Sequence, residues 1–257
     1  IEPNAATVAL DLLVSRRKTL LRGVKPEAEL LIDGRLYPVG GLLGQPNYAF
    51  LQPAWVDTLH SDPAAFQFTG FAVGKAKAPF PWKRVRHHAP GAAWPPGGVH
   101  LRMDYRLPQG AGSDILVQVH YELYDGIPVI AKWIAVENRG NISITIDRFY
   151  SELLAAVEYG GSVEARKYTA PPPAIHVETD FAFASMYAED ANHHVVHWQP
   201  DPDYLTQVNY QRLTPCLLKV GPEIGPAQVV EPGATFTSFR TFVLPQDSDD
   251  RERQGLA

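Results

Sequence analysis

The chain has 257 residues, of which 45% are hydrophobic and 20% are charged, and this is the composition of an ordinary globular protein. Its 23 Lys and Arg residues against 28 Asp and Glu residues give a net charge of −5, which argues against a nucleic-acid-binding surface. No apolar run approaches the about 20 residues that cross a bilayer, so we expect no membrane span. The single cysteine, Cys216, excludes an internal disulfide.

The first hundred residues predict strands joined by turns. Residues 5–14 alternate as an opening strand, and residues 29–38 predict a hairpin about Asp33-Gly34. The Gly-rich stretch 40–45 lacks the Lys-Ser/Thr of a phosphate-binding loop, and we expect no cofactor. Residues 76–98 are dense in Pro, Trp and basic side chains, which predicts a long ordered loop, and a strand is expected over 99–107.

Residues 115–150 are the most informative stretch, because they predict a β-meander. Residues 115–124 alternate between apolar and polar side chains and are followed by Asp125-Gly126, which favours a type I′ hairpin turn. A second strand is expected over 127–136, with Trp133 packed in the core and Lys132 on the opposite face. A third strand follows a turn at 138–140.

The remaining residues also predict short strands. These are expected at 151–159 (where a short helix is the alternative), 181–187, 193–198, 204–212, 216–220 and 235–243. Many short strands without a long helical period predict an all-β fold, either a sandwich or a barrel, with few short helices.

Both ends of the chain suggest a part of a longer protein. The sequence begins at Ile1 without a signal-peptide pattern, and Asp249 to Glu252 resembles a helix start. We therefore expect a β domain over 1–246 and the start of a helical linker over 247–257, leading to a C-terminal domain. If a leader has been removed, a periplasmic or extracellular location is favoured, and otherwise a cytoplasmic one.

The block from Tyr121 to Asn138, YELYDGIPVIAKWIAVEN, resembles the N-terminal β-supersandwich domain of α-galactosidase-like glycoside hydrolases. The resemblance extends more loosely through 195–198, 204–210 and 232–242, and into 247–253. It implies a galactose mutarotase-like fold of two large antiparallel sheets. It also implies carbohydrate and a C-terminal catalytic domain as partners, with the catalytic carboxylates in that barrel domain, so the resemblance carries no catalytic residue over to this chain.

The Pro- and Trp-rich loop is the first candidate contact with carbohydrate or with another domain. Aromatic faces accept the C–H surface of sugars, and charged side chains bind the hydroxyls. The alternative is that its two tryptophans only pin the loop to the sandwich. The candidate residues are Trp82, Arg84, Arg86, His87, His88 and Trp94.

The polar side of the middle strands is the second candidate. His100 and Asp104 share one side of their strand, and His120 and Glu122 share one side of theirs. If the strands are neighbours, these residues form an acid/base set for an aldose 1-epimerase (mutarotase-like) reaction. The alternative is a solvated sheet face with ion pairs such as one between Arg102 and Glu122.

No metal site is expected. His193 and His197 on a strand would lie about 13 Å apart, which is too far for one ion with bonds of about 2.1 Å. Three hypotheses therefore remain: a non-catalytic carbohydrate-associated domain of a larger glycoside hydrolase, an epimerase, and a purely structural module that could hold a homo-oligomer together.

Overall fold

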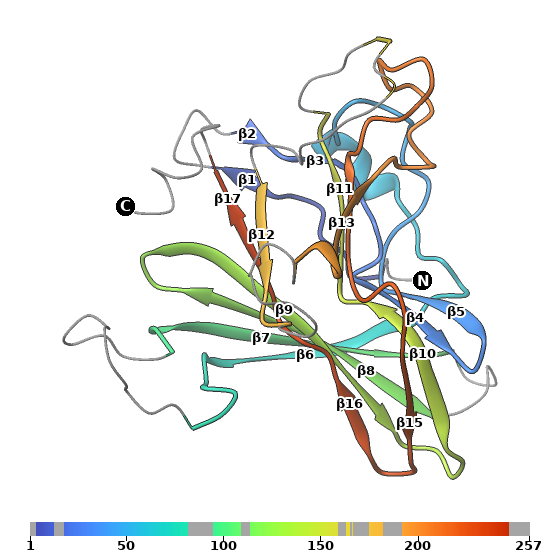
Figure 1. The fold of residues 1–257 in the computed structure, drawn as a ribbon, viewed down its shortest axis with the longest axis vertical. Helices are drawn as coiled ribbons and strands as arrows, with labels where there is room; N and C mark the ends of the chain where they lie inside the picture. Colours follow the sequence, from blue (N-terminus) through green and yellow to red (C-terminus); the bar gives the residue numbers. More distant parts are fainter. Residues whose placement is uncertain are drawn as a thin grey trace.

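Strands form nearly all the regular structure of the protein in the computed structural model, which describes residues 4–12, 18–81, 95–108, 114–158, 163–164, 166, 175–181 and 192–246. Every ladder between two of these strands is antiparallel, and a 3-10 helix, η1 (Pro53–Thr58), lies in the loop after β5. The expected all-β antiparallel class is thus confirmed (Figure 1).

The first layer is a seven-stranded sheet in the order β12-β17-β9-β8-β7-β6, with β16 also pairing with β9. In Figure 1 its strands β6 to β9 cross the lower half of the view, and β12 and β17 rise from them. The strands are β6 (Gln67–Lys75), β7 (Gly98–Arg106), β8 (Ile115–Tyr124), β9 (Ile127–Asn138), β12 (Ile175–Thr179), β16 (Thr235–Thr237) and β17 (Thr241–Pro245).

The second layer consists of two four-stranded sheets, ordered β15-β10-β4-β5 and β13-β14-β11-β3. Their strands are β3 (Leu21–Gly23), β4 (Ala28–Ile32), β5 (Arg35–Val39), β10 (Ile144–Tyr150), β11 (Glu152–Ala156), β13 (Val196–Gln199), β14 (Leu217–Val220) and β15 (Pro226–Val230). Only buried Ser151 separates β10 from β11, so the two sheets are continuous through the chain at this residue. Its Oγ lies 3.3 Å from Thr241 Oγ1 of the first layer.

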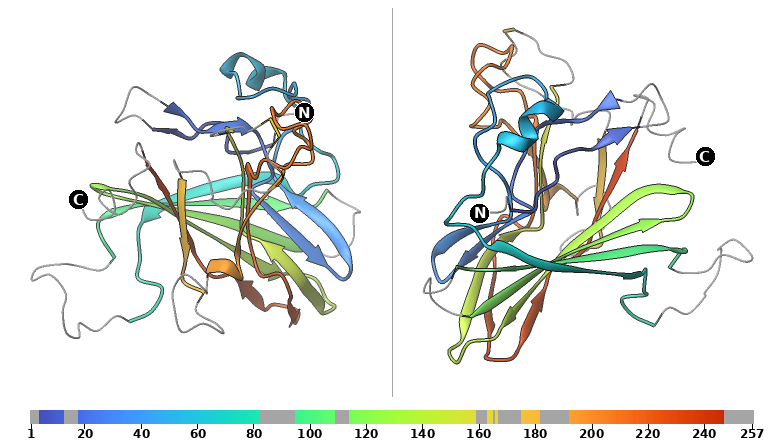
Figure 2. Two further views of the ribbon diagram at one scale, coloured as in Figure 1. Left: turned by 45° about the horizontal axis from the view of Figure 1, so that its top comes forward. Right: turned by 180° about the vertical axis from the view of Figure 1, so that it is seen from behind.

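Two hydrophobic cores fill the space between the layers. The larger core packs the sheet of β4 and β10 against β7, β8 and β9, and includes Phe66, Tyr105 and Ile134. The smaller packs the sheet of β3, β11 and β14 against β12 and β17, around Leu218 and Val243. Figure 2 shows β1 (Asp11–Leu12) and β2 (Lys18–Thr19) as a separate pair above the first layer.

The two predicted Asp-Gly hairpins exist but turn differently. At Asp33 and Gly34 both φ angles are positive, 49° and 75°, as a type I′ turn requires. At the second turn only Gly126 has a positive φ, so the type I′ prediction for 125–126 is wrong. The pairing there moves from Tyr124 with Ile127 to Leu123 with Ile130, which places two extra residues in β9.

Some of the predicted strands are shorter or absent. Of the described residues 5–12, only Asp11 and Leu12 are in a strand. The strand expected over 193–198 is β13, which begins at Val196. Residues 204–212 form successive turns instead of a strand. Asn209 Oδ1 accepts hydrogen bonds from two backbone N–H groups of this segment, so a side chain satisfies donors that a ladder would have used.

Candidate functional site: the outer face of the seven-stranded sheet

All four predicted acid/base residues lie on the outer face, which is the face of the seven-stranded sheet turned away from the second layer. Three of them, His100, His120 and Glu122, lie close together. β7 and β8 are neighbours as the prediction required, and His100 is paired with Glu122 in the register. His120 is two positions along, opposite Arg102. Asp104 lies further along the same face, where it bonds Arg102 and Gln118.

Trp133 completes this set from β9, and its position corrects the expectation that it packs in the core. It pairs with His120 across the β8–β9 ladder and therefore lies on the outer face. Its ring is nearly parallel to the rings of His120 and His100, with centroids 4.8 and 5.5 Å away. The guanidinium of Arg240, just before β17, lies 4.0 Å from the Trp133 centroid. We call His100, His120, Glu122, Trp133 and Arg240 the outer-face array.

The two histidines of the array share a hydrogen bond. His100 Nε2 and His120 Nδ1 are 2.9 Å apart, so one nitrogen donates and the other accepts. Burial, together with the positive charge of Arg240 and Arg102, lowers the pKa of His100. Burial, then His100 and Arg102, lower the pKa of His120 to about 4. The neutral imidazole therefore predominates in both residues at pH 7.

Glu122 is buried and both of its oxygens accept hydrogen bonds. Oε2 accepts from Tyr124 Oη at 2.9 Å and from Arg240 Nη1 at 3.0 Å, and Oε1 accepts from the Lys77 backbone at 3.2 Å. Burial and the bond to Glu122 raise the pKa of Tyr124 to about 12. The expected ion pair between Arg102 and Glu122 is wrong, because Arg102 pairs with Asp104 instead.

The Pro- and Trp-rich loop begins and ends beside this array. The Lys77 backbone bonds Glu122, the Ala76 N–H donates to Gly98, and the Gly97 carbonyl accepts from Asp125. The loop candidates Trp82, Arg84, Arg86, His87, His88 and Trp94 lie outside the described residues. The described ends of the loop therefore lie beside the outer-face array.

A buried charged triad lies on the other side of the same sheet, and sequence reasoning missed it. Lys132 Nζ lies 2.7 Å from Glu152 Oε1 and 3.2 Å from Glu27 Oε2 between the layers. Burial opposes the charge on Glu27, but Lys132 and the hydroxyls of Tyr121 and Thr7 outweigh it, so its pKa is below the ordinary value. Burial raises the pKa of Glu152 despite Lys132. Lys132 thus faces the core, so the prediction that it lies on the face opposite the core is wrong.

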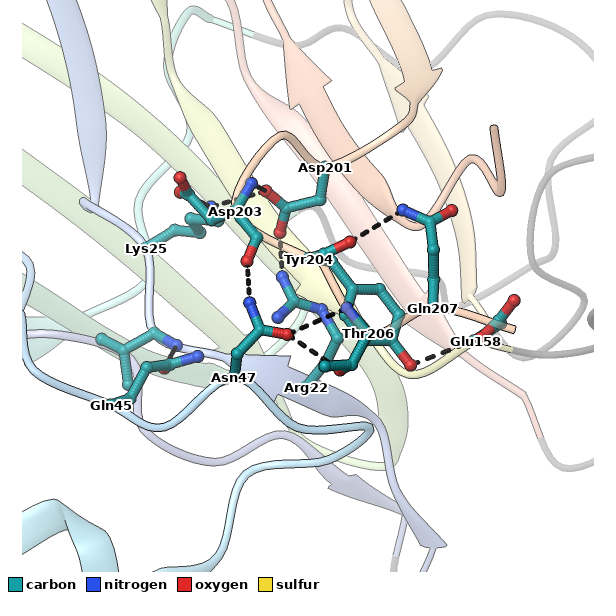
Figure 3. Close-up of polar contacts among 11 residues, drawn as sticks. Arg22, Lys25, Gln45, Asn47, Glu158, Asp201, Asp203, Tyr204, Thr206 and Gln207 are labelled. Carbon is teal, nitrogen blue, oxygen red and sulfur yellow. Dashed lines mark hydrogen bonds and ion pairs between the residues drawn. The ribbon is translucent and has the colours of Figure 1, made fainter. Parts of the chain in front are cut away.

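A second dense polar cluster holds a loop of the second layer in place (Figure 3). The buried Arg22 of β3 forms an ion pair with Asp201, and its guanidinium lies 4.4 Å from the centroid of the Tyr204 ring. Lys25 Nζ reaches Asp201 at 2.9 Å and Asp203 at 2.7 Å. These contacts fasten residues 201–204 to the end of β3, so the cluster supports the fold.

The histidines of the 193–197 segment do not form a metal site among the described residues. His193 and His194 precede β13 in a helical turn and not on the strand assumed for the spacing argument. Within the described part of the chain, no group of three His, Cys, Asp or Glu side chains could hold a metal ion. No helix of the described ranges is long and apolar enough to cross a bilayer.

Comparison with known proteins gives only distant similarity. No family model and no curated protein matches the chain. Solved structures that are similar include two of the GH36 α-galactosidase AgaA from Geobacillus stearothermophilus, in complex with raffinose and with stachyose. Both are 14% identical, with TM-scores of 0.41 and 0.42, and the match covers 89% of this chain. It covers 40% of the galactosidase, so this chain spans about two fifths of that length.

Proposed function

We propose that this chain is a non-catalytic, carbohydrate-associated domain of a larger glycoside hydrolase of the α-galactosidase type. In this proposal the reaction takes place in a C-terminal catalytic domain. The resemblance over residues 121–138 supports the family, and the antiparallel sandwich agrees with the fold that this resemblance implies. The outer-face array and the adjacent loop would contact carbohydrate or the catalytic domain.

The bonding of Glu122 is the observation that favours binding over catalysis. General acid–base catalysis needs one group that can take up a proton and one that can release a proton near neutral pH. Both oxygens of Glu122 already accept hydrogen bonds, from Arg240, from Tyr124 and from the Lys77 backbone. His120, with a pKa lowered to about 4, is a neutral imidazole at pH 7 and so lacks the acidic proton of an imidazolium. An epimerase built on these residues would therefore lack its acid.

Enzyme assays of the purified chain test this proposal. We expect no hydrolysis of p-nitrophenyl α-galactoside, and no acceleration of the mutarotation of freshly dissolved α-galactose in a polarimeter. The matched variants are His120→Asn and Glu122→Gln, which remove the two candidate groups. Turnover by the wild type that disappears in either variant would refute the proposal and support the epimerase.

A structural role in an oligomer is the second candidate. Several large apolar side chains are exposed on two loops of the second layer: Tyr48, Phe50, Leu205, Val208 and Tyr210. Asn47 ties these loops together by accepting hydrogen bonds from the backbone and hydroxyl of Thr206. Light scattering of the wild type and of Tyr210→Ser tests this role. A wild type that is monomeric at all concentrations would exclude it.

A further inference from the structure

A cleft on the second layer is a separate candidate for a binding site. It has a volume of about 410 Å³ and lies where β13, the edge strand of its sheet, meets the end of β10 and the turn after β14. Its lining includes Tyr150, His197, Trp198, Gln199, Lys219 and Glu223. The outer-face array belongs to the first layer, so the two sites do not share residues.

The polar side chains of the cleft are held in place by the strands around it. His197 and Lys219 are paired in the β13–β14 ladder, so they lie side by side. Lys219 Nζ donates to Glu29 Oε2 at 2.9 Å, which uses one of its three protons. His197 Nε2 is 3.0 Å from the Gly221 carbonyl, so this nitrogen donates a hydrogen bond that fixes the ring.

An aromatic ring is fixed beside these polar groups. The Tyr150 ring lies with its centroid 4.8 Å from Lys219 Nζ. Gly221 packs so closely that a Cβ there would lie 2.8 Å from Tyr150 Cδ1 and 2.1 Å from the Phe149 carbonyl oxygen. The ring is therefore positioned before any ligand arrives, which reduces the entropy lost on binding.

The chemistry of the lining selects the class of ligand. Lys219 is a donor, Glu223 is an acceptor, and the Gln199 amide is both, which suits a ligand with many hydroxyl groups. Among the described lining residues, Lys219 is the cation and is balanced by Glu29, and Glu223 adds a second negative charge, so these groups favour a neutral ligand over an anion. The volume is near the lower end of the range of about 300–1,000 Å³ for small-molecule pockets. We propose that this cleft binds one or two neutral pyranose units.

Nuclear magnetic resonance of the full chain tests this proposal. Methyl α-galactoside and methyl α-glucoside are titrated to about 100 mM, a range suited to millimolar dissociation constants. We expect at least one of them to shift the backbone amides of His197, Gln199 and Lys219. Inorganic phosphate serves as the anion probe, and we expect it to leave these amides unmoved.

Two variants assign the binding to the cleft. Lys219→Met and Gln199→Ala should each weaken binding, the first by about tenfold because it removes a charged donor. Lys75→Met, at an exposed residue of β6, is the matched control and should bind as the wild type does. Unmoved cleft amides with both sugars, unchanged affinity in both cleft variants, or shifts with phosphate alone would overturn the proposal.

The indole resonance of Trp133 separates this result from the test of the proposed function. Trp133 belongs to the outer-face array, and its signal is assigned from its loss in Trp133→Phe. A sugar that shifts only the amide resonances of the cleft supports sugar binding in the cleft, whether or not the outer-face array also functions as proposed. A sugar that shifts only the Trp133 indole resonance supports binding at the outer-face array and overturns the proposal for the cleft.

Discussion

Replacing Lys132 by Met tests the buried triad most directly. The ammonium lies 2.7 Å from Glu152 and 3.2 Å from Glu27, and none of the three side chains is more than 5% exposed. Removing the cation leaves two carboxylates in a site without bulk water, and such a loss destabilises a protein by about 3–5 kcal/mol. At about 2–4 °C per kcal/mol for a chain of this size, Tm should fall by about 6–20 °C. Urea and thermal unfolding followed by circular dichroism measure both quantities.

The pH dependence of this loss provides a second and sharper test. In the wild type the pKa of Glu27 is lowered, so its contribution to stability is complete at neutral pH and disappears as the pH falls through the lowered pKa. In Lys132→Met burial is opposed only by the hydrogen bonds from Tyr121 and Thr7, and the remaining Glu152 charge adds to burial, so the pKa of Glu27 in the folded state should rise above the ordinary value of about 4.3. A raised pKa means that stability increases as the pH falls, so the deficit should be smaller at pH 5.5 than at pH 7.5.

Two comparisons make the test decisive. Lys75→Met, at an exposed position, should change stability by less than about 0.5 kcal/mol. Adding Glu27→Gln and Glu152→Gln to Lys132→Met removes the uncompensated charge and should recover part of the loss. A loss below about 1 kcal/mol in Lys132→Met, or an equal loss at both pH values, would refute the reasoning from burial and charge.

Three further results are expected. His120 should titrate by NMR with a midpoint of about 4, and Trp133→Ala should move this midpoint toward the ordinary value of about 6.5, because it opens the ring to water. Arg22→Met should destabilise the fold by about 1.5–3 kcal/mol in urea unfolding, because buried Asp201 loses one of its two cationic partners and keeps Lys25. Gly98→Ala should lower stability by about 1–3 kcal/mol in thermal unfolding, since its Cβ would lie 2.2 Å from a carbonyl oxygen of β8. Gly74→Ala, which meets nothing within 4 Å, is its neutral control.

The sequence contained enough information to place Trp133 and Lys132 correctly. A two-residue turn that pairs Tyr124 with Ile127 puts Trp133 opposite Gln118, on the polar side of β8. The extra two residues of β9 shift its partner to His120, which is on the same side, because a shift of two positions preserves the face. The prediction failed because it followed the apolar neighbours of Trp133 and not the register of the hairpin.

Other parts of the site could not be predicted from local pattern. Arg240 reaches Glu122 across 118 residues of sequence, and it does so because β17 pairs with β9. The division of the second layer into two sheets depends on Ser151, where no Gly or Pro marks a break. Alternation predicted which strands exist in the meander, but the partners of the strands from other parts of the chain depend on tertiary packing.

The buried charges of this protein bear on the proposed non-catalytic role of the chain. Glu122 is paired with Arg240, Asp201 with Arg22, and Glu27 with Lys132, and in each case the partners are distant in sequence. These pairs fix which distant segments meet, because any other arrangement would leave a charge buried alone. A carboxylate that acts as a general acid or base must change its protonation during turnover, whereas protonating Glu122 would remove the charge partner of Arg240. Activity that depends on Glu122 would therefore require the array to open first, and an unchanged Trp133 indole signal during turnover would contradict this conclusion.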